Sequence, residues 1–322
     1  MKDFKPARAL LMLGLGLGLL ASTAVQAAYP ERPIRIVVTF AAGGASDIVA
    51  RTISEPLSKL MGQPVIVDNK PGAGGTLGGL DVVRSPADGY TLMLSNSTPL
   101  SIGPFTVPKQ PYDPARQFPH IAMLGVAPVL LMANPKSGPA TLKDLPKAAA
   151  AAGYTFASGG PGSIGHIVGE MAKAAMKIQM LHIPYRGGAP MTTDLIAGVI
   201  PVGIDVITAF VPIVKAGQIR ALAVTTRQRS PLLPDVPTTT ELGYPSLVAE
   251  NYFGVSGPAG LPRDVSDKLG QALAQIVADP GIVKRFEELG ITTVKMSAGE
   301  FAELVNKQAN DWSPLIKAMD LK

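Results

Sequence analysis

The sequence predicts an α/β protein whose two domains are built from the same kind of unit. Short apolar runs rich in β-branched residues alternate with glycine-rich turns and helical patterns, first within 34–60 and again within 154–176. Such runs suit strands that are buried on both faces of a parallel sheet. A proline-rich, irregular stretch at 108–119 separates the two groups of units. Repetition and length together therefore indicate two domains.

Residues 1–28 have the pattern of a secretory signal peptide. Three basic residues precede the apolar stretch Ala9–Leu20, and small residues favour cleavage near Ala27 or Ala28. An uncleaved membrane anchor is the alternative, but the apolar stretch is short for a bilayer span and is interrupted by glycines. We therefore expect an exported protein that resides in the periplasm.

After removal of the signal, the chain carries a small positive net charge. About 294 residues remain, and the formal charge falls from +5 to +3 because three basic residues and one acidic residue are lost. This charge, without a dense basic run, does not indicate nucleic-acid binding. The chain has no cysteine, so a core of this size must provide the stability that disulfides give smaller exported proteins. We expect a soluble monomer without a metal or cofactor.

The first unit predicts an anion site. The apolar run that begins at Ile34 ends in Gly43-Gly44, and Ser46 and Asp47 can cap the helix that follows. Free N–H groups at the positive end of a helix suit a carboxylate or a phosphate. The alternative is that the glycines only permit a tight turn. Pro56 should kink or shorten this helix.

The next two units place polar residues at a strand end. We expect strands at Val65–Val67 and Tyr90–Leu94 and a helix from Thr76. The second strand runs into Ser95-Asn96-Ser97-Thr98, at the edge where open α/β sheets bind ligands. For Ser97 and Thr98, a plain helix cap is the equal alternative.

The rest of the chain repeats the design and then becomes helical. We expect apolar strands at Ile121–Leu124 and at Val129–Ala133, where the latter crosses into another domain, and a helix from Thr141. A connection at 231–243 leads to a returning segment and to a helical tail from Asp264 that packs on the first domain. The intervening elements are strands at Tyr154–Ala157, Leu181–Pro184, Val202–Val206 and Ile219–Val224, helices at Ile164–Met176 and Pro190–Ala197, and the return at Tyr252–Val255.

Several stretches together resemble the Bug family, also called the TctC family, of periplasmic solute-binding proteins for tripartite tricarboxylate-type transporters. The matching stretches are TFAAGGASD at 39–47, DNKPGAGG at 68–75, DGYTL at 88–92, PYRG at 184–187, and LAVT at 222–225 before PDVPT at 234–238. They follow the order of the family over the whole mature chain. Thr39 departs from the usual proline, and Tyr252-Phe253 stand where a tryptophan is common. These departures concern the shape of the ligand, not its class.

The resemblance implies a two-domain periplasmic binding protein of the Venus-flytrap type, with a cleft between two βα domains. Residues 29–128 and 252–322 would form one domain and residues 129–251 the other. The protein would not be an enzyme. It would hold a small carboxylate, such as a di- or tricarboxylate, an acidic amino acid or an aromatic acid. It would deliver this ligand to the small and large integral membrane subunits of a permease.

Candidate ligand contacts lie in the turns and at the strand ends. Carried over by position, the resemblance implies Phe40, Ala42, Gly44, Ser46, Asp47, Ser158, Gly162, Ser163, His166 and Asp205. The turns and the strand end themselves add Gly43, Ser97, Thr98 and Tyr185. Neutral donors would satisfy a carboxylate without burying an opposite ion, which is costly to desolvate.

Three of these roles have open alternatives. Arg186 either pairs with the ligand or stays partly exposed. His166 either touches the ligand or reinforces its helix. Asp205 would repel a carboxylate, so a water molecule or an amino group of the ligand suits it better.

Rival functions rest on the same glycine turn. Gly160–Gly165 matches G-x-G-x-x-G between a strand and a helix, so an exported dinucleotide enzyme is the main alternative. The expected acid after the next strand is missing, and Tyr185-Arg186 stand there instead. A serine hydrolase is less favoured because Pro161 replaces the first glycine of the G-x-S-x-G motif. The three histidines lack zinc-motif spacing. A purely structural role is the third possibility.

Overall fold

The computed structural model describes residues 29–107 and 110–319. The predicted signal peptide and its cleavage site lie outside these residues. Within them, no helix has the combination of length and apolar character that a membrane span requires.

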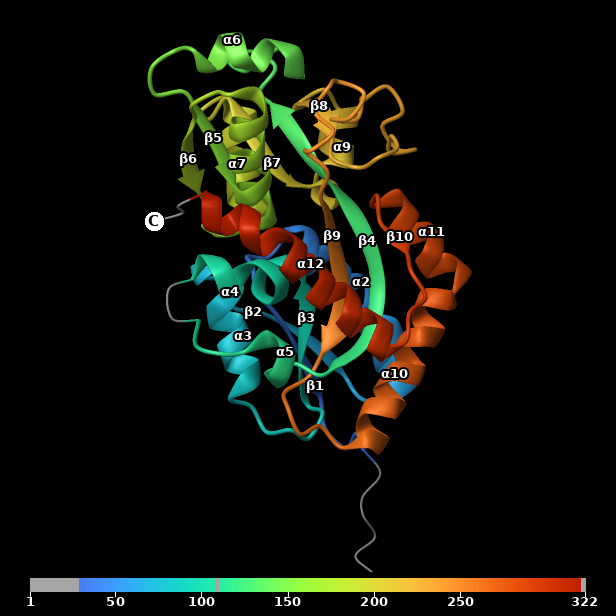
Figure 1. Ribbon diagram of the computed structural model, residues 1–322. Helices are drawn as coiled ribbons and strands as arrows, with labels where there is room; N and C mark the ends of the chain where they lie inside the picture. Colours follow the sequence, from blue (N-terminus) through green and yellow to red (C-terminus); the bar gives the residue numbers. More distant parts are fainter. Residues whose placement is uncertain (1–28, 108–109, 320–322) are drawn as a thin grey trace, which may run out of the picture.

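The first half of the sheet carries the order β2-β1-β3-β9-β4 (Figure 1). Its strands are β1 (Ile34–Val38), β2 (Val65–Asn69), β3 (Thr91–Asn96), β9 (Glu250–Ser256) and β4 (His120–Ala133). β1 pairs in parallel with β2 and β3, whereas β9 is antiparallel to both β3 and β4. The two-residue strand β10 (Thr292–Thr293) adds to β4 and was not predicted. The three parallel strands confirm the βα units expected from the sequence.

The second half of the sheet begins on the same strand β4. From Val129 onward, β4 pairs with β7 (Val202–Val206) and β8 (Arg220–Val224), and up to Pro128 it pairs with β9. β5 (Thr155–Ser158) pairs in parallel with β6 (Leu181–Pro184) and β7. In Figure 1, β4 and β9 run between the two halves of the molecule. Strands β6 and β7 have the predicted bounds.

The prediction of two separate strands within 121–133 is wrong, because β4 is continuous over fourteen residues. Gly125 and Pro128 interrupt the apolar pattern of this segment. Pro128 cannot donate a ladder hydrogen bond, but it lies where β4 changes from β9 to β7 and β8 as partners. The strand therefore continues through the proline.

Helices cover both halves of the sheet. The first half carries η2 (Ala73–Gly75), α2 (Ala45–Met61), α3 (Thr76–Val83), η3 (Thr98–Ile102), α4 (Gly103–Thr106) and α5 (Pro114–Gln117). The second half carries η4 (Leu142–Asp144), α6 (Leu145–Ala149), α7 (Ile164–Met176), α8 (Gly188–Ala197), η5 (Ile207–Ala209) and α9 (Val211–Lys215). Helix α7 has the predicted bounds. The helix expected from Thr141 is only the short pair η4 and α6.

The tail contains α10 (Arg263–Ala278), α11 (Pro280–Glu288) and α12 (Ala298–Ala318). Helix α10 packs on α2 and β4, and α12 packs on η3, α4 and β4. The helical tail therefore lies on elements of the first sheet half, as the sequence predicted (Figure 1).

Two predictions about α2 need correction. The N-cap residue is Gly44, and Ser46 and Asp47 lie inside the first turn instead of capping it. Of the two effects expected of Pro56, a kink or a shortened helix, the second is wrong, because the helix continues to Met61. A proline inside a helix costs roughly 3 kcal/mol. The fully buried apolar face of α2 offsets this cost, since Val49, Ile53 and Leu57 are all inaccessible to solvent.

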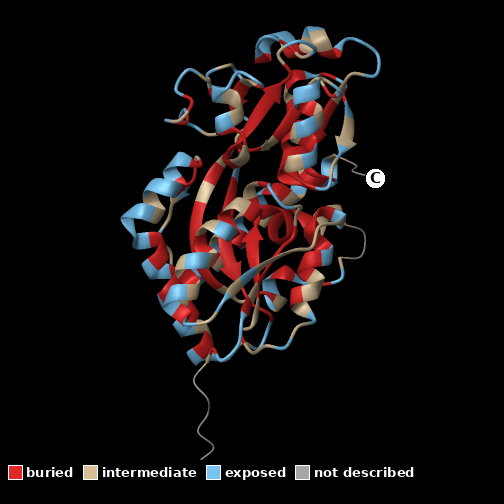
Figure 2. Cartoon of the chain, turned by 180° about the vertical axis from the view of Figure 1, so that it is seen from behind, coloured by how far each residue is buried: buried red, intermediate tan, exposed pale blue. Residues whose placement is uncertain are grey.

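The core occupies both faces of the first sheet half, which Figure 2 shows as buried strands between helices. On one face, Ile34, Ile36 and Val38 join the main apolar cluster under α2. On the other face, Val37 and Tyr252 join a second cluster with residues of α12. The prediction that β1 is buried on both faces is confirmed, and the carboxyl ends of its sheet point toward the second half.

Candidate functional site

A narrow cavity lies where three helices begin, and we call it the front crevice. It involves the starts of α2, α7 and α8 and the ends of β3 and β7. Its volume is about 30 Å³. It is lined by Phe40, Gly44, Ala45, Ser46, Asn96, Thr98, Gly159, Ser163, Ile164, Gly188, Asp205, Val206 and Asn251. Six of the predicted site residues therefore meet here, namely Phe40, Gly44, Ser46, Thr98, Ser163 and Asp205.

The two sides of the front crevice touch each other along a seam. The backbone N–H of Ala41 donates to the carbonyl oxygen of Arg186 at 3.2 Å. The N–H of Ile164, the first residue of α7, donates to the hydroxyl of Thr98 at 3.3 Å. A methyl group on Gly74 would lie 2.6 Å from the carbonyl oxygen of Pro161. The two sides are therefore in contact, and backbone approaches backbone across the seam.

Asp47 holds the turn that precedes α2 in place. Its Oδ2 accepts hydrogen bonds from the N–H of Gly43 at 2.9 Å and from Nε of Arg51 at 3.0 Å. Burial alone would raise the pKa of Asp47, but the bonds from Arg51 and Gly43 outweigh it and lower the pKa. Gly43 has a φ of 80°, which favours glycine. Ala42, Gly43 and Asp47 do not line the front crevice, so Asp47 fixes the turn that presents Gly44.

The second turn rests on a buried network of hydroxyl and imidazole groups. Ser158 Oγ bonds Nε2 of His182 at 2.7 Å and accepts from the hydroxyl of Ser163 at 3.0 Å. Ser163 Oγ also accepts from the N–H of His166 at 3.3 Å and caps α7. The N–H of Gly162 donates to Nδ1 of His166 at 3.0 Å, so the ring proton is assigned to Nε2.

The imidazole rings of this network are stacked and neutral. The rings of His166 and His182 lie 3.8 Å apart between centroids, with 12° between their planes. Burial lowers the pKa of His166 to about 4 and that of His182 to about 3, so neither carries charge at neutral pH. Ser158, Gly162 and His166 do not line the front crevice and instead brace the turn that carries Ser163.

After β3, Ser97 is held by hydrogen bonds within the protein, whereas Thr98 lines the front crevice. Ser97 donates its N–H to Oδ1 of Asn251 at 3.4 Å, and its hydroxyl accepts from the N–H of Tyr252 at 3.3 Å. Thr98 lines the crevice, and its N–H donates to Oδ1 of Asn96 at 3.0 Å. Asn96 and Asn251 also line the crevice and were not predicted. Asn96 was within the polar cluster, whereas nothing in the local sequence signalled Asn251.

Asp205 is the acidic group of the front crevice. Its Oδ1 accepts from the N–H of Val206 at 2.8 Å, and a methyl group on Gly188 would lie 2.8 Å from Oδ2. Burial raises the pKa of the Asp205 carboxyl to about 6, although the Val206 N–H opposes the shift. The folded protein therefore holds this carboxylate less favourably than the unfolded chain does.

Replacing Asp205 with asparagine should stabilise the protein in a pH-dependent way. The wild-type carboxyl has a folded pKa of about 6 against the ordinary value of 3.8, so wild-type stability is lost as the pH rises between these values. The gain in Asp205→Asn should be full above pH 6 and should shrink toward pH 4. Urea unfolding of both proteins across this range measures it, and a gain that does not vary with pH would contradict the assignment.

A second cavity, which we call the outer pocket, adjoins the front crevice. Its volume is about 360 Å³, and it shares Phe40 and Gly159 with the crevice. Tyr185 lines it, with its hydroxyl donating to Oδ2 of Asp194 at 2.5 Å. The remaining lining residues are Pro71, Gly72, Ala73, Gly74, Gly75, Leu77, Gly160, Pro161 and Arg186.

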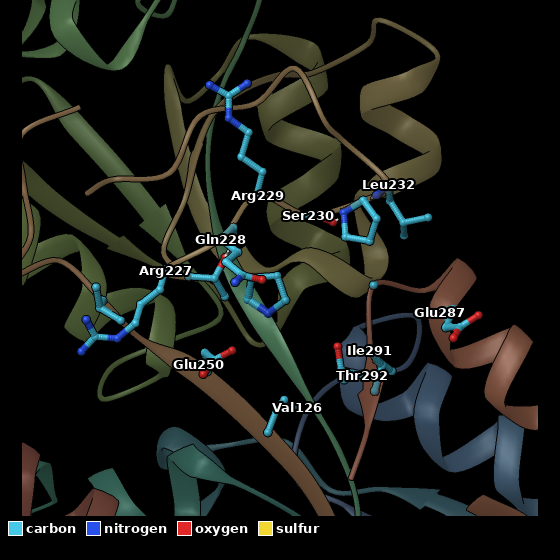
Figure 3. A pocket seen from close by; sticks show the side chains of 15 residues that line it. Val126, Arg227, Gln228, Arg229, Ser230, Leu232, Glu250, Glu287, Ile291 and Thr292 are labelled. Atoms are coloured by element: carbon cyan, nitrogen blue, oxygen red, sulfur yellow. Dashed lines mark hydrogen bonds between the residues drawn. The ribbon is translucent and has the colours of Figure 1, made fainter. Parts of the chain in front are cut away.

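A third cavity, the rear pocket, lies where the chain crosses between the halves (Figure 3). Its volume is about 380 Å³, and Val126, Glu250, Ile291 and the segment 226–232 contribute to its wall. No predicted site residue lines it. Among residues 29–107 and 110–319, no group of three His, Asp or Glu side chains is arranged to hold a metal.

The glycines of the G-x-G-x-x-G match have local packing reasons. A methyl group on Gly165 would lie 2.0 Å from the carbonyl oxygen of Ile204 on β7, and one on Gly162 would lie 2.5 Å from Oγ1 of Thr106. Gly165 is needed because α7 approaches its sheet closely, and Gly162 is needed because the two sides meet at the seam.

Known proteins resemble this chain over most of its length. Residues 49–321 match the family model described as the tripartite tricarboxylate transporter family receptor. The chain is 36% identical over 292 residues to a UPF0065 protein in the tcbD-tcbE intergenic region of Pseudomonas sp. strain P51, covering 90% of this chain and 87% of that one. It is 33% identical to the protein BugT of Bordetella pertussis, with 91% of each chain covered.

Solved structures resemble the whole described fold. The periplasmic binding protein BugD superposes with a TM-score of 0.87 at 32% identity, covering 91% of this chain and 99% of BugD. MatC from Rhodopseudomonas palustris, with bound malate, has a TM-score of 0.86 at 28% identity, covering 89% and 100% of the two chains. An R. palustris protein with adipate has a TM-score of 0.86 at 30% identity, with 90% and 98% covered.

Proposed function

The chain belongs to the family of tripartite tricarboxylate transporter receptors, and from that premise we propose that it captures a small carboxylate by closing the front crevice. BugD, a periplasmic binding protein, and the malate-bound MatC share its fold over nearly their whole length. Malate and adipate, found in two of the similar structures, are both carboxylates. The proposal transfers this class of ligand to the present chain.

One observation carries the proposal: helices α2, α7 and α8 all begin at the same small cavity. Each helix start presents backbone N–H groups that lie outside the helical ladder and the positive end of a helix dipole, which favour an anion. Ser46 and Thr98 add hydroxyl groups at the same place, whereas the hydroxyl of Ser163 already donates to Ser158. Neutral donors bind a carboxylate without a buried counter-ion and still allow release.

We propose that the ligand enters an open form and is enclosed by rotation of two domains. The front crevice has a volume of about 30 Å³, which is too small to admit a dicarboxylate in the closed form. Residues 29–128 and 252–322 would move as one domain and residues 129–251 as the other. The hinge would lie at Pro128–Val129 and near Glu250, where β4 changes partners and the chain returns.

The cellular role follows from the same premise. We propose that the protein is exported, loses its signal near Ala27 or Ala28 and acts in the periplasm as a monomer. It would hand its ligand to the small and large integral membrane subunits of a permease. The family description, a transporter receptor, supports delivery to a membrane partner, and a binding protein needs no catalytic step.

A calorimetric panel tests the proposal. Malate, succinate, adipate and citrate would be titrated into the protein, with adipamide as an uncharged control of matched length and NADP as the rival ligand. At least one carboxylate should bind and raise the melting temperature with increasing concentration, while adipamide should not. Binding of NADP without any carboxylate would favour the dinucleotide enzyme instead.

A further inference from the structure

We propose that the outer pocket selects linear dicarboxylates, because Arg186 at its rim pairs with the second carboxylate of a ligand whose first carboxylate lies in the front crevice. This inference rests on the proposed function and adds the ligand class to it. The argument uses the space, the charges and the walls of the two cavities.

The two cavities that share Phe40 would hold different parts of one ligand. Phe40 and Gly159 line both the front crevice, of about 30 Å³, and the outer pocket, of about 360 Å³. The two cavities are therefore neighbours with a common wall. A ligand whose first carboxyl group lies at the helix starts would extend past Phe40 into the outer pocket, whose volume falls in the usual range of small-ligand sites.

The charges give the ligand a direction. Among the residues that line the two cavities, Arg186 is the one cation and Asp205 the one anion. Asp205 belongs only to the front crevice and Arg186 only to the outer pocket. A second carboxylate is thus attracted to the outer end, whereas the helix starts must hold the first carboxylate against the charge of Asp205.

Arg186 is placed for this role by closure. Its carbonyl oxygen accepts from the N–H of Ala41 across the seam at 3.2 Å, so the closed form fixes its backbone at the cavity. Its side chain is exposed, and no ion pair between described residues engages it. A guanidinium group with free donors matches a carboxylate in bidentate fashion.

The walls of the outer pocket favour a hydrocarbon spacer. Leu77 is 55% exposed, although it is a large apolar side chain, and it lies over Gly72, where a methyl group would be 2.6 Å from Leu77 Cδ1. Pro71, Pro161 and the ring of Phe40 add apolar surface. Methylene groups would pack there, whereas a third carboxylate would meet apolar walls and lose hydration. Linear dicarboxylates therefore fit better than branched tricarboxylates.

The test compares adipate with its monomethyl ester, which keeps the length and removes one charge. Both would be titrated calorimetrically into the wild type, Arg186→Gln, Arg186→Lys and Arg227→Gln. Arg227 is the matched control because it is also exposed but lines the rear pocket (Figure 3). Melting temperatures would show that each variant is folded.

The wild type should prefer adipate over the ester by roughly five- to thirtyfold, as expected for a partly solvated charged hydrogen bond. Arg186→Gln should reduce this preference to about twofold or less, Arg186→Lys should retain part of it, and Arg227→Gln should leave it unchanged. An unchanged preference in Arg186→Gln, or an equal loss for both ligands, would overturn the inference. Failure of the wild type to bind any carboxylate would instead overturn the proposed function.

Discussion

Replacement of Gly74 with alanine should weaken carboxylate binding roughly ten- to hundredfold while leaving the protein folded. The added methyl group would lie 2.6 Å from the carbonyl oxygen of Pro161, which belongs to the opposite side of the seam. Because the obstructing atom is backbone, a side-chain rotation cannot relieve the contact. The closed form would be destabilised and the open form would not, so the ligand would lose affinity in proportion.

A matched glycine separates this effect from backbone strain. Gly62 has a φ of 72° against 58° for Gly74, and a methyl group on Gly62 would meet nothing within 4 Å. An alanine in this left-handed region costs about 1 kcal/mol at either position. Gly62→Ala should therefore lose a similar amount of stability and bind ligand normally. Equal affinities of the two variants would show that the seam does not close on the ligand.

Replacement of Thr225 with valine should lower the free energy of unfolding by about 2–4 kcal/mol, because two buried polar groups lose a partner. The Thr225 hydroxyl donates to the carbonyl oxygen of Ala249 at 2.6 Å and accepts from the N–H of Val129 at 3.1 Å. These bonds join β4, the end of β8 and the segment before β9, at the point where the chain crosses between the sheet halves. Urea unfolding measures the loss.

The conservative variant Thr225→Ser is the control for this prediction. It keeps the hydroxyl and removes one methyl group, so its loss should be near 1 kcal/mol. A valine variant as stable as the serine variant would mean that the crossing does not depend on these hydrogen bonds. If the crossing is the hinge, Thr225→Val should also alter ligand affinity, which Thr225→Ser should preserve.

Local patterns in the sequence predicted most of the βα units. The bounds of α7, β6 and β7 agree with the predictions, and a glycine or proline marks one boundary of each: Gly162 before α7, Pro184 in β6 and Pro201 before β7. The continuity of β4 could not be predicted, since Pro128 is tolerated only where the strand changes partners. Strand β10 has two residues, so it depends on pairing with β4 and not on a pattern of its own.

The sequence predicted which turns form the site, but it predicted less well which side chains line it. The turns at Gly43–Asp47 and Gly159–Ser163 do come together, because both follow the carboxyl ends of strands. His166 belongs to a brace that depends on His182, which comes from another strand. Asn251 enters the crevice from the returning segment, a long-range contact that no local pattern reports.

Small-angle X-ray scattering with and without adipate tests the central claim most directly, namely that the front crevice closes on a carboxylate. The free protein should have the larger radius of gyration, and saturation with ligand should reduce it to the value expected of the closed structure. Gly74→Ala should stay expanded at ligand concentrations that close the wild type. An unchanged radius of the wild type at calorimetric saturation would contradict capture by closure.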